Sequence, residues 1–207
     1  QFQGASYVGY DEETASHLLD LPVDPHSDLN ENGFTRLQEW IYAMYETRGR
    51  KGGGIFNYKS DPVAVNCLFS GNYALDAGAG MFNEHADPTV INCTFTNNVS
   101  LNGGGGMENS YSTPSLTNTI LYGNGSDMAG YEEIMNEGGT PEFLYCNVAG
   151  SGGSTGWNSL LGSDGGGNID QDPLFLAVGE HPWRPDHGSP CIDAGTNEPF
   201  EATGSAH

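Results

Sequence analysis

The sequence predicts an all-β protein, a parallel β-helix (solenoid) of about four to five coils with an extension at each end. Three observations support this prediction. A pattern of residues recurs every 26 positions, apolar and polar residues alternate inside each copy, and glycine and asparagine punctuate the copies. Helical repeats have longer periods of about 33–47 residues, so a period of this length indicates a β-solenoid.

The repeat is clearest in three segments, DPVAVNCLFSGN (61–72), DPTVINCTFTNN (87–98) and TPSLTNTILYGN (113–124). Proline, asparagine and large apolar residues keep the same step of 26 through these segments. Upstream of them, GGGIFN, GAGMFN and GGGMEN repeat in the same phase. A fourth, degenerate copy at 134–148 is shifted by one residue. This many in-phase matches indicate successive coils that stack on one another.

Each copy is predicted to hold two short strands joined by a bend. The side chains expected to face inward alternate along the chain and are Val65, Cys67, Phe69, Ile91, Cys93 and Phe95. Asparagine tolerates the left-handed backbone conformation, so we expect Asn66, Asn92 and Asn118 to make the bends. One coil apart, these amides can hydrogen-bond to each other along the axis. Cys67 and Cys93 would form a second stacked row of small apolar groups.

The segments GGGIFN…NCLFSGN and GAGMFN…NCTFTNN resemble the repeats of right-handed parallel β-helix proteins, in particular the polymorphic outer-membrane type. The downstream NIDQDPLF…HGSPCIDAG (168–195) is similar to the end of the "choice-of-anchor" β-helix domains of bacterial surface proteins. The resemblance covers residues 52–196. It implies a right-handed parallel β-helix and secretion or surface display, and it implies no shared catalytic set.

By analogy with that family, Cys67 and Cys93 are expected to be free buried thiols. A disulfide between Cys67 and Cys93, one coil apart, and one between Cys146 and Cys191 both stay open. The spacing of cysteines and histidines shows no zinc pattern.

A calcium loop is predicted before the solenoid. The segment DLNENGFTRLQE (28–39) fits the pattern D-x-[DN]-x-[DN]-G-x₅-E without a gap. Calcium needs six to eight oxygen ligands, and the expected ligands are Asp28, Asn30, Asn32, the Phe34 carbonyl and Glu39. Two neutral amides and the positive Arg36 predict weak affinity, suited to extracellular calcium. The alternative is an Asn/Gly-rich turn capped by Asp28.

Three regions follow from these patterns. Residues 1–51 are expected to hold an N-terminal strand, the calcium loop and an amphipathic helix (35–47) that caps the first coil. Residues 52–150 are the coils, and residues 151–207 are a Gly/Ser loop followed by a C-terminal cap. A cap at each end is expected because a solenoid exposes apolar core and strand edges at its ends.

Composition excludes several functions. Six Lys and Arg residues stand against 27 Asp and Glu residues, and the formal net charge of −21 disfavours nucleic acid and anionic membranes. No apolar run reaches the length of about 20 residues that a membrane span needs. A calcium-dependent polysaccharide lyase or hydrolase is the less favoured reading, because the repeats contain one Lys and no paired carboxylate motif. We therefore expect a non-enzymatic extracellular or cell-surface protein.

The expected function is structural: a secreted, calcium-stabilised solenoid that assembles with copies of itself into a fibre or surface layer. Its expected joint is the N-terminal strand, with Phe2, Tyr7 and Tyr10, against the C-terminal cap around Trp183 of another copy. The alternative is an adhesin or glycan-binding module that uses exposed aromatic side chains or the loop around Trp157. Glycosylation signals at turn positions make Asn98 and Asn124 candidate sites for attached sugar.

Overall fold

The computed structural model describes residues 51–179 and 181–197. They belong to one compact unit, residues 50–207. The strand expected at 1–10, the calcium loop at 28–39 and the helix at 35–47 lie outside the described residues and stay predictions.

The described residues form sixteen short strands and no helix. The first coil consists of β1 (Ile55–Tyr58), β2 (Val63–Val65), β3 (Leu68–Ser70) and β4 (Tyr73–Ala74). The second consists of β5 (Met81–Glu84), β6 (Thr89–Ile91), β7 (Thr94–Thr96) and β8 (Val99–Ser100), and the third of β9 (Met107–Ser110), β10 (Ser115–Thr117), β11 (Ile120–Leu121) and β12 (Gly125–Ser126). The fourth coil has β13 (Ile134–Glu137), β14 (Glu142–Leu144) and β15 (Asn147–Val148), and β16 (Ser163–Gly166) begins an incomplete fifth.

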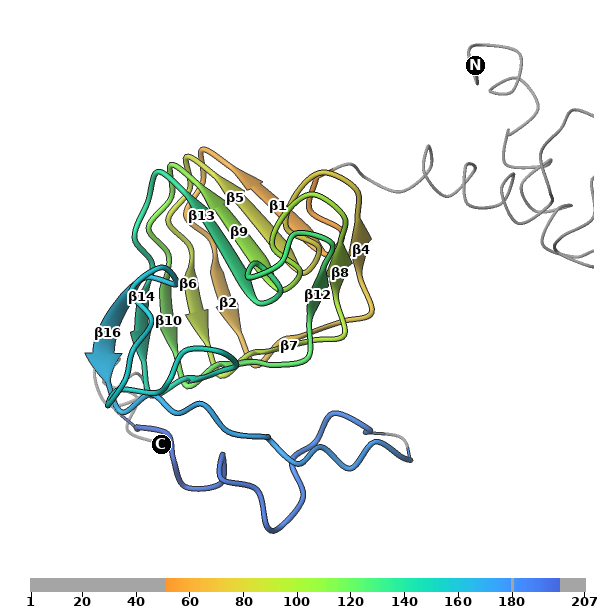
Figure 1. Cartoon of the computed structure of the whole chain (residues 1–207), viewed down its shortest axis with the longest axis vertical. Helices are drawn as coiled ribbons and strands as arrows, with labels where there is room; N and C mark the ends of the chain where they lie inside the picture. Colours follow the sequence, from red (N-terminus) through yellow and green to blue (C-terminus); the bar gives the residue numbers. More distant parts are fainter. Residues whose placement is uncertain (1–50, 180, 198–207) are drawn as a thin grey trace, which may run out of the picture. The chain divides into compact units, whose positions relative to one another are not determined.

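These strands stack into four parallel sheets within the described residues, and Figure 1 shows successive coils side by side. The sheet orders are β1-β5-β9-β13, β16-β14-β10-β6-β2, β15-β11-β7-β3 and β12-β8-β4. Each residue pairs with its counterpart one repeat later, as Asn57 does with Asn83 and Asn83 with Asn109. The predicted parallel β-solenoid of about four turns is therefore confirmed.

Rows of apolar side chains, one from each coil, fill the interior. The three main rows are Met81, Met107 and Ile134; Val90, Leu116 and Phe143; and Phe69, Phe95, Leu121 and Val148. The rings of Phe69 and Phe95 stack with centroids 4.4 Å apart. A narrow solenoid can exclude water with such small rows because every coil buries the same positions as its neighbours.

The asparagine bends are confirmed, with φ of 54° at Asn66, 52° at Asn92 and 51° at Asn118. The predicted inward alternation before the bend is wrong by one residue. Val90 is fully buried, whereas Ile91 is partly exposed. The left-handed residue at the bend places two consecutive side chains outward, so the alternation restarts after it.

The same shift applies one coil earlier, where Ala64 packs against the core and Val65 is exposed. The four cysteines, all among the described residues, are free thiols. Cys93 is buried as expected for the stacked row, but Cys67 is exposed because no described coil covers its outer side; Cys146, which was not predicted for this row, is also buried.

Two further asparagine ladders run through the interior. Side-chain amides link Asn57, Asn83, Asn109 and Asn136 in one ladder and Asn72, Asn98 and Asn124 in the other. Asn98 and Asn124, the two candidate glycosylation sites, are therefore buried. The prediction that they carry sugar is wrong for the folded chain, because ladder bonding and burial leave no room for a glycan.

The two ends of the described solenoid differ. After the fourth coil, Trp157 packs on Phe143 with ring centroids 5.3 Å apart, and Leu161 joins the core. The Asn136 amide donates to the carbonyls of Leu160 and Leu161, which closes that ladder. The loop around Trp157, an alternative site for a glycan in the sequence analysis, thus covers the core.

The first coil has no such cover among the described residues. Phe56 is 46% exposed whereas its partner Phe82, one coil inward, is 2% exposed. Val63 and Leu68 are 65% and 55% exposed on the neighbouring strands of that coil. The apolar edge of the first coil therefore needs a covering group that the described residues do not supply.

The remaining C-terminal residues lie along the side of the solenoid and do not cap its end. Residues 170–197 run back past the coils and return toward β16 (Figure 1). Residues 181–184 reach Asn66 and Leu68 of the first coil. This placement differs from the expected cap because Trp157 and Leu161 already cover the core.

Candidate functional site

A groove runs along one side of the solenoid, and we call it the side groove. Its floor is the row of bend residues Asn66, Asn92 and Asn118, and its wall is the segment 181–197. The end near Asn66 has a volume of about 410 Å³, and the part between Asn92 and Asn118 has a volume of about 420 Å³. Asn92 lines both parts, so the two adjoin at this residue.

A short hairpin forms the wall near the first coil. The backbone N–H of Leu176 donates to the carbonyl of Arg184 at 3.0 Å, which pairs the two arms. Trp183 packs edge-on against Phe175, with ring centroids 5.9 Å apart and planes at 82°. The backbone pairing and the ring contact hold Trp183 beside the groove.

The wall is fastened to the floor through Asn118. The Asn118 amide donates to the carbonyl of Thr196 at 2.8 Å, and the N–H of Thr196 donates to Asn118 Oδ1 at 2.8 Å. One carboxamide thus binds both polar groups of a peptide backbone. The pairing is possible because the bend turns the asparagine side chain outward, away from the core.

The neighbouring bend residues carry the same amide with fewer partners. Asn92 donates to Asn66 Oδ1 at 3.2 Å and accepts from Asn118 Nδ2 at 3.0 Å. A carboxamide has two N–H donors and two acceptor lone pairs. Among the described residues, one donor and one lone pair of Asn92 are therefore left for a ligand.

The side groove carries charge of both signs. Arg184 lines the end near Asn66, together with His181, and Asp193 lines the part near Asn118. At the base of the hairpin, hydrogen bonds from the side chain and backbone of His187 lower the pKa of Asp186 below its usual value. Asp186 is therefore ionised, but it lines neither part of the groove, where Asp193 is the acidic side chain and Arg184 the basic one.

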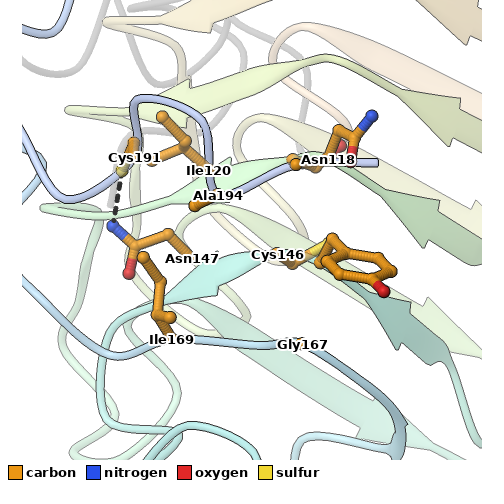
Figure 2. A pocket seen from close by; sticks show the side chains of 11 residues that line it. Asn118, Ile120, Cys146, Asn147, Gly167, Ile169, Cys191 and Ala194 are labelled. Carbon is orange, nitrogen blue, oxygen red and sulfur yellow. Dashed lines mark hydrogen bonds between the residues drawn. The ribbon is translucent and has the colours of Figure 1, made fainter. Parts of the chain in front are cut away.

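A smaller pocket of about 90 Å³ adjoins the Asn118 end, and Figure 2 shows its lining. Asn147 Nδ2 donates to Cys191 Sγ at 3.1 Å across this pocket. Cys146 lies on the opposite wall, and burial raises its pKa to about 12. With this raised pKa, Cys146 is protonated at neutral pH. Because the thiolate is the reactive form, this side chain is unsuited to nucleophilic chemistry.

Two buried carboxylates were missed by sequence reasoning. Glu108 Oε2 accepts the backbone N–H groups of Gly78 and Gly104, each at 3.1 Å, and burial raises its pKa. Glu133 ends one asparagine ladder by accepting from Asn124, and burial raises its pKa to about 7. The repeat contains one indication of Glu108, because this glutamate stands at the position that Phe82 occupies one coil earlier.

The structure brings together some of the predicted site residues. Trp183, predicted for assembly, lines the same groove as Asn66, Cys67 and Asn92. The calcium ligands and the aromatic residues of the N-terminal strand lie outside the described residues. Thr196 was missed by sequence reasoning, because residues 170–197 have no repeat or alternation from which its position could be inferred.

Among the residues that the structure describes, no group of three or more His, Cys, Asp or Glu side chains is placed to hold a metal ion. In the same part of the chain, no helix has the length and hydropathy needed to cross a membrane.

Comparison of the chain with protein-family models, curated proteins and solved structures gave no significant match.

Proposed function

We propose that the chain is an extracellular structural protein, an acidic β-solenoid that assembles with copies of itself into a fibre or surface layer. The difference between its two ends is the observation that carries this proposal. In the described residues each sheet has an edge strand at both ends, but Trp157 and Leu161 cover the core at one end, whereas apolar side chains are exposed at the other. Unpaired strand edges and exposed apolar side chains favour protein–protein contact.

The open end has the composition of a docking surface. Val63, Leu68 and Phe56 are each about half exposed or more, and they come from three different strands of the first coil. Because the opposite end is covered, a head-to-tail contact would join this surface to a different surface of the next copy. A heterologous contact with another surface propagates as a filament unless its rotation closes a ring.

Calcium is the proposed stabilising ion. The support is the loop pattern at Asp28, Asn30, Asn32, Phe34 and Glu39, together with a net charge of −21 that a divalent cation would offset. Calorimetric titration tests the site. The parent chain is expected to bind one calcium ion weakly, and Asp28→Ala is expected to bind none. Equal calcium binding by Asp28→Ala would remove this part of the proposal.

We propose a non-catalytic role. The support is that the buried carboxylates Glu108 and Glu133 are occupied by hydrogen bonds within the fold. Burial also raises the pKa of Cys93 to about 11, so this thiol is protonated at neutral pH.

A glycan-binding module is the second candidate. The observation that favours it is the side groove, where Asn66 and Asn92 offer amides beside Trp183. The loop around Trp157, an earlier candidate for this role, is occupied in covering the core, with Trp157 Nε1 donating to the Gly162 carbonyl at 2.8 Å.

The assembly proposal is tested by placing a charge on the open end. Val63→Glu is expected to reduce assembly in light scattering at least tenfold, because a carboxylate would have to be desolvated in the contact. Val99→Glu is the matched control, since Val99 is 37% exposed on a strand of the second coil. We expect this variant to assemble like the parent.

Two outcomes would contradict the proposal. Unchanged assembly of Val63→Glu would exclude the open end as the contact. A loss of thermal stability in Val63→Glu alone, with assembly unchanged, would show that the chain's own residues cover this end.

A further inference from the structure

We propose that the side groove binds an extended, uncharged peptide in trans, and that residues 1–10 of a second copy supply it. This inference rests on the self-assembly proposed above and names the contact that would join two copies. It extends that proposal from the open end to a second surface, the groove between the bend asparagines and the C-terminal hairpin.

The protein itself shows how the groove holds a peptide backbone. Thr196 binds Asn118 through both its N–H and its carbonyl. Asn92 is the equivalent residue one coil away, with the same backbone conformation (φ 52° against 51°). It retains one donor and one acceptor after its ladder bonds. A second peptide unit can therefore pair with Asn92 as Thr196 pairs with Asn118.

Beyond Asn92, the groove becomes apolar enough for a side chain. Leu68, 55% exposed, and Trp183 line this end, whose volume of about 410 Å³ is in the range of about 300–1,000 Å³ typical of ligand sites. An aromatic side chain packed against Trp183 gains both apolar burial and ring contact. The groove thus combines a backbone anchor with a side-chain pocket about one coil apart.

Charge and length select the occupant. The segment QFQGASYVGY (1–10) has no charged side chain in a chain whose net charge is −21, and it contains Phe2, Tyr7 and Tyr10. An uncharged segment avoids repulsion from Asp193, which lines the groove. Asn66 and Asn118 are two coils apart, or about 10 Å, and three extended residues span about 10 Å. A few residues of this segment are therefore enough to occupy the groove.

The experiment is a calorimetric titration of the full chain with the synthetic peptide QFQGASYVGY, followed by light scattering of the same samples. We expect the peptide to bind and, in excess, to reduce the mass of the assemblies. Trp183→Ala and Asn92→Gly are each expected to weaken peptide binding at least tenfold. Glycine at position 92 keeps the positive φ without strain, and thermal unfolding checks that each variant is folded.

Two controls make the result specific. Asn97→Gly replaces an exposed asparagine that also has a positive φ (54°) but does not line the groove, and it should bind the peptide like the parent. A peptide with Phe2, Tyr7 and Tyr10 replaced by serine should not bind.

The outcomes separate this inference from the proposed function. If the parent assembles but the peptide neither binds nor competes, the inference is wrong and self-assembly stands. If the parent is monomeric and still binds the peptide in the groove, self-assembly and the contact in trans are both wrong, and only the peptide-binding groove stands. Binding of neutral oligosaccharides in place of the peptide, lost in Trp183→Ala, would assign the groove to a glycan and overturn the inference.

Discussion

Glu133 terminates an asparagine ladder by accepting two hydrogen bonds from Asn124, one from its side-chain amide and one from its backbone N–H. Along this ladder the Asn72 amide donates to Asn98 and the Asn98 amide donates to Asn124, so the row of donors leads to this carboxylate. An amide ladder leaves an unpaired N–H at its last member, and Glu133 supplies the acceptor for it. The carboxyl group is buried, so its protonation state is linked to the stability of the fourth coil.

The stability of the fold should therefore depend on pH through Glu133. Burial raises its pKa from 4.5 to about 7. Between these values the folded state binds the proton more tightly than the unfolded state. Stability from this group is complete below pH 4.5 and is lost as the pH rises through 7. The free energy of unfolding should fall by about 3 kcal/mol across this range from this group alone.

Glu133→Gln removes this titration, so its unfolding free energy should change less between pH 4.5 and pH 7 than that of the parent. Glu132→Gln is the matched control, because Glu132 is exposed and the substitution removes the same formal charge. Chemical denaturation at several pH values measures the difference. Identical pH profiles for Glu133→Gln and the parent would contradict the assignment.

Asn98 is predicted to be the most costly ladder residue to remove. Its amide donates to Asn124 Oδ1 and to the Phe69 carbonyl, and its oxygen accepts two hydrogen bonds from Asn72. Asn98→Ala leaves these buried groups without partners, and we expect a loss of about 3 kcal/mol in the free energy of unfolding.

Asn102→Ala is the control for Asn98→Ala. Asn102 is exposed, and its side chain makes one hydrogen bond, to the Leu75 carbonyl. We expect a loss of about 1 kcal/mol for this variant. A loss for Asn98→Ala no larger than for Asn102→Ala in urea denaturation would show that the ladder does not stabilise the fold.

Gly80 should tolerate no side chain, because successive coils approach closely there. A Cβ at this position would lie 2.4 Å from the carbonyl oxygen of Gly106 in the next coil. The coils would have to separate, so Gly80→Ala should lower the free energy of unfolding by about 3 kcal/mol. At Gly188 a Cβ would meet only the Leu174 side chain, at 4.0 Å. Thermal unfolding should show little change for Gly188→Ala, and equal losses for both variants would refute the explanation.

The cysteines should react with a maleimide in two classes. Cys67 is exposed and Cys191 is partly exposed, so both should be labelled in the native chain. Cys93 and Cys146 are buried, and burial raises their pKa to about 11 and about 12. They should be labelled only after unfolding, as mass spectrometry of the labelled peptides can show. Labelling of Cys93 as fast as Cys67 would contradict the stacked row.

Much of the solenoid could be predicted from the sequence because each coil repeats the same contacts. The step of 26 residues places Asn66 on Asn92 and Asn92 on Asn118, so the register and the bend follow from the pattern. The inward alternation was misplaced at Ile91 because a left-handed residue interrupts the period of two.

The side groove could not be predicted in the same way. Thr196 lies 78 residues from Asn118, and no repeat relates the two. The roles of Trp157 and Trp183 also depend on where irregular segments fold back, one over the core and the other beside the bend row. Long-range contacts of this kind leave no periodic signal in one sequence.

The mass of the chain in solution, measured over a range of concentrations with calcium and with a chelator, tests self-assembly most directly. Our account predicts a mass that rises with concentration above the 22.0 kDa of one chain when calcium is present and falls when calcium is removed. A single species of 22.0 kDa at every concentration, with calcium present, would contradict it.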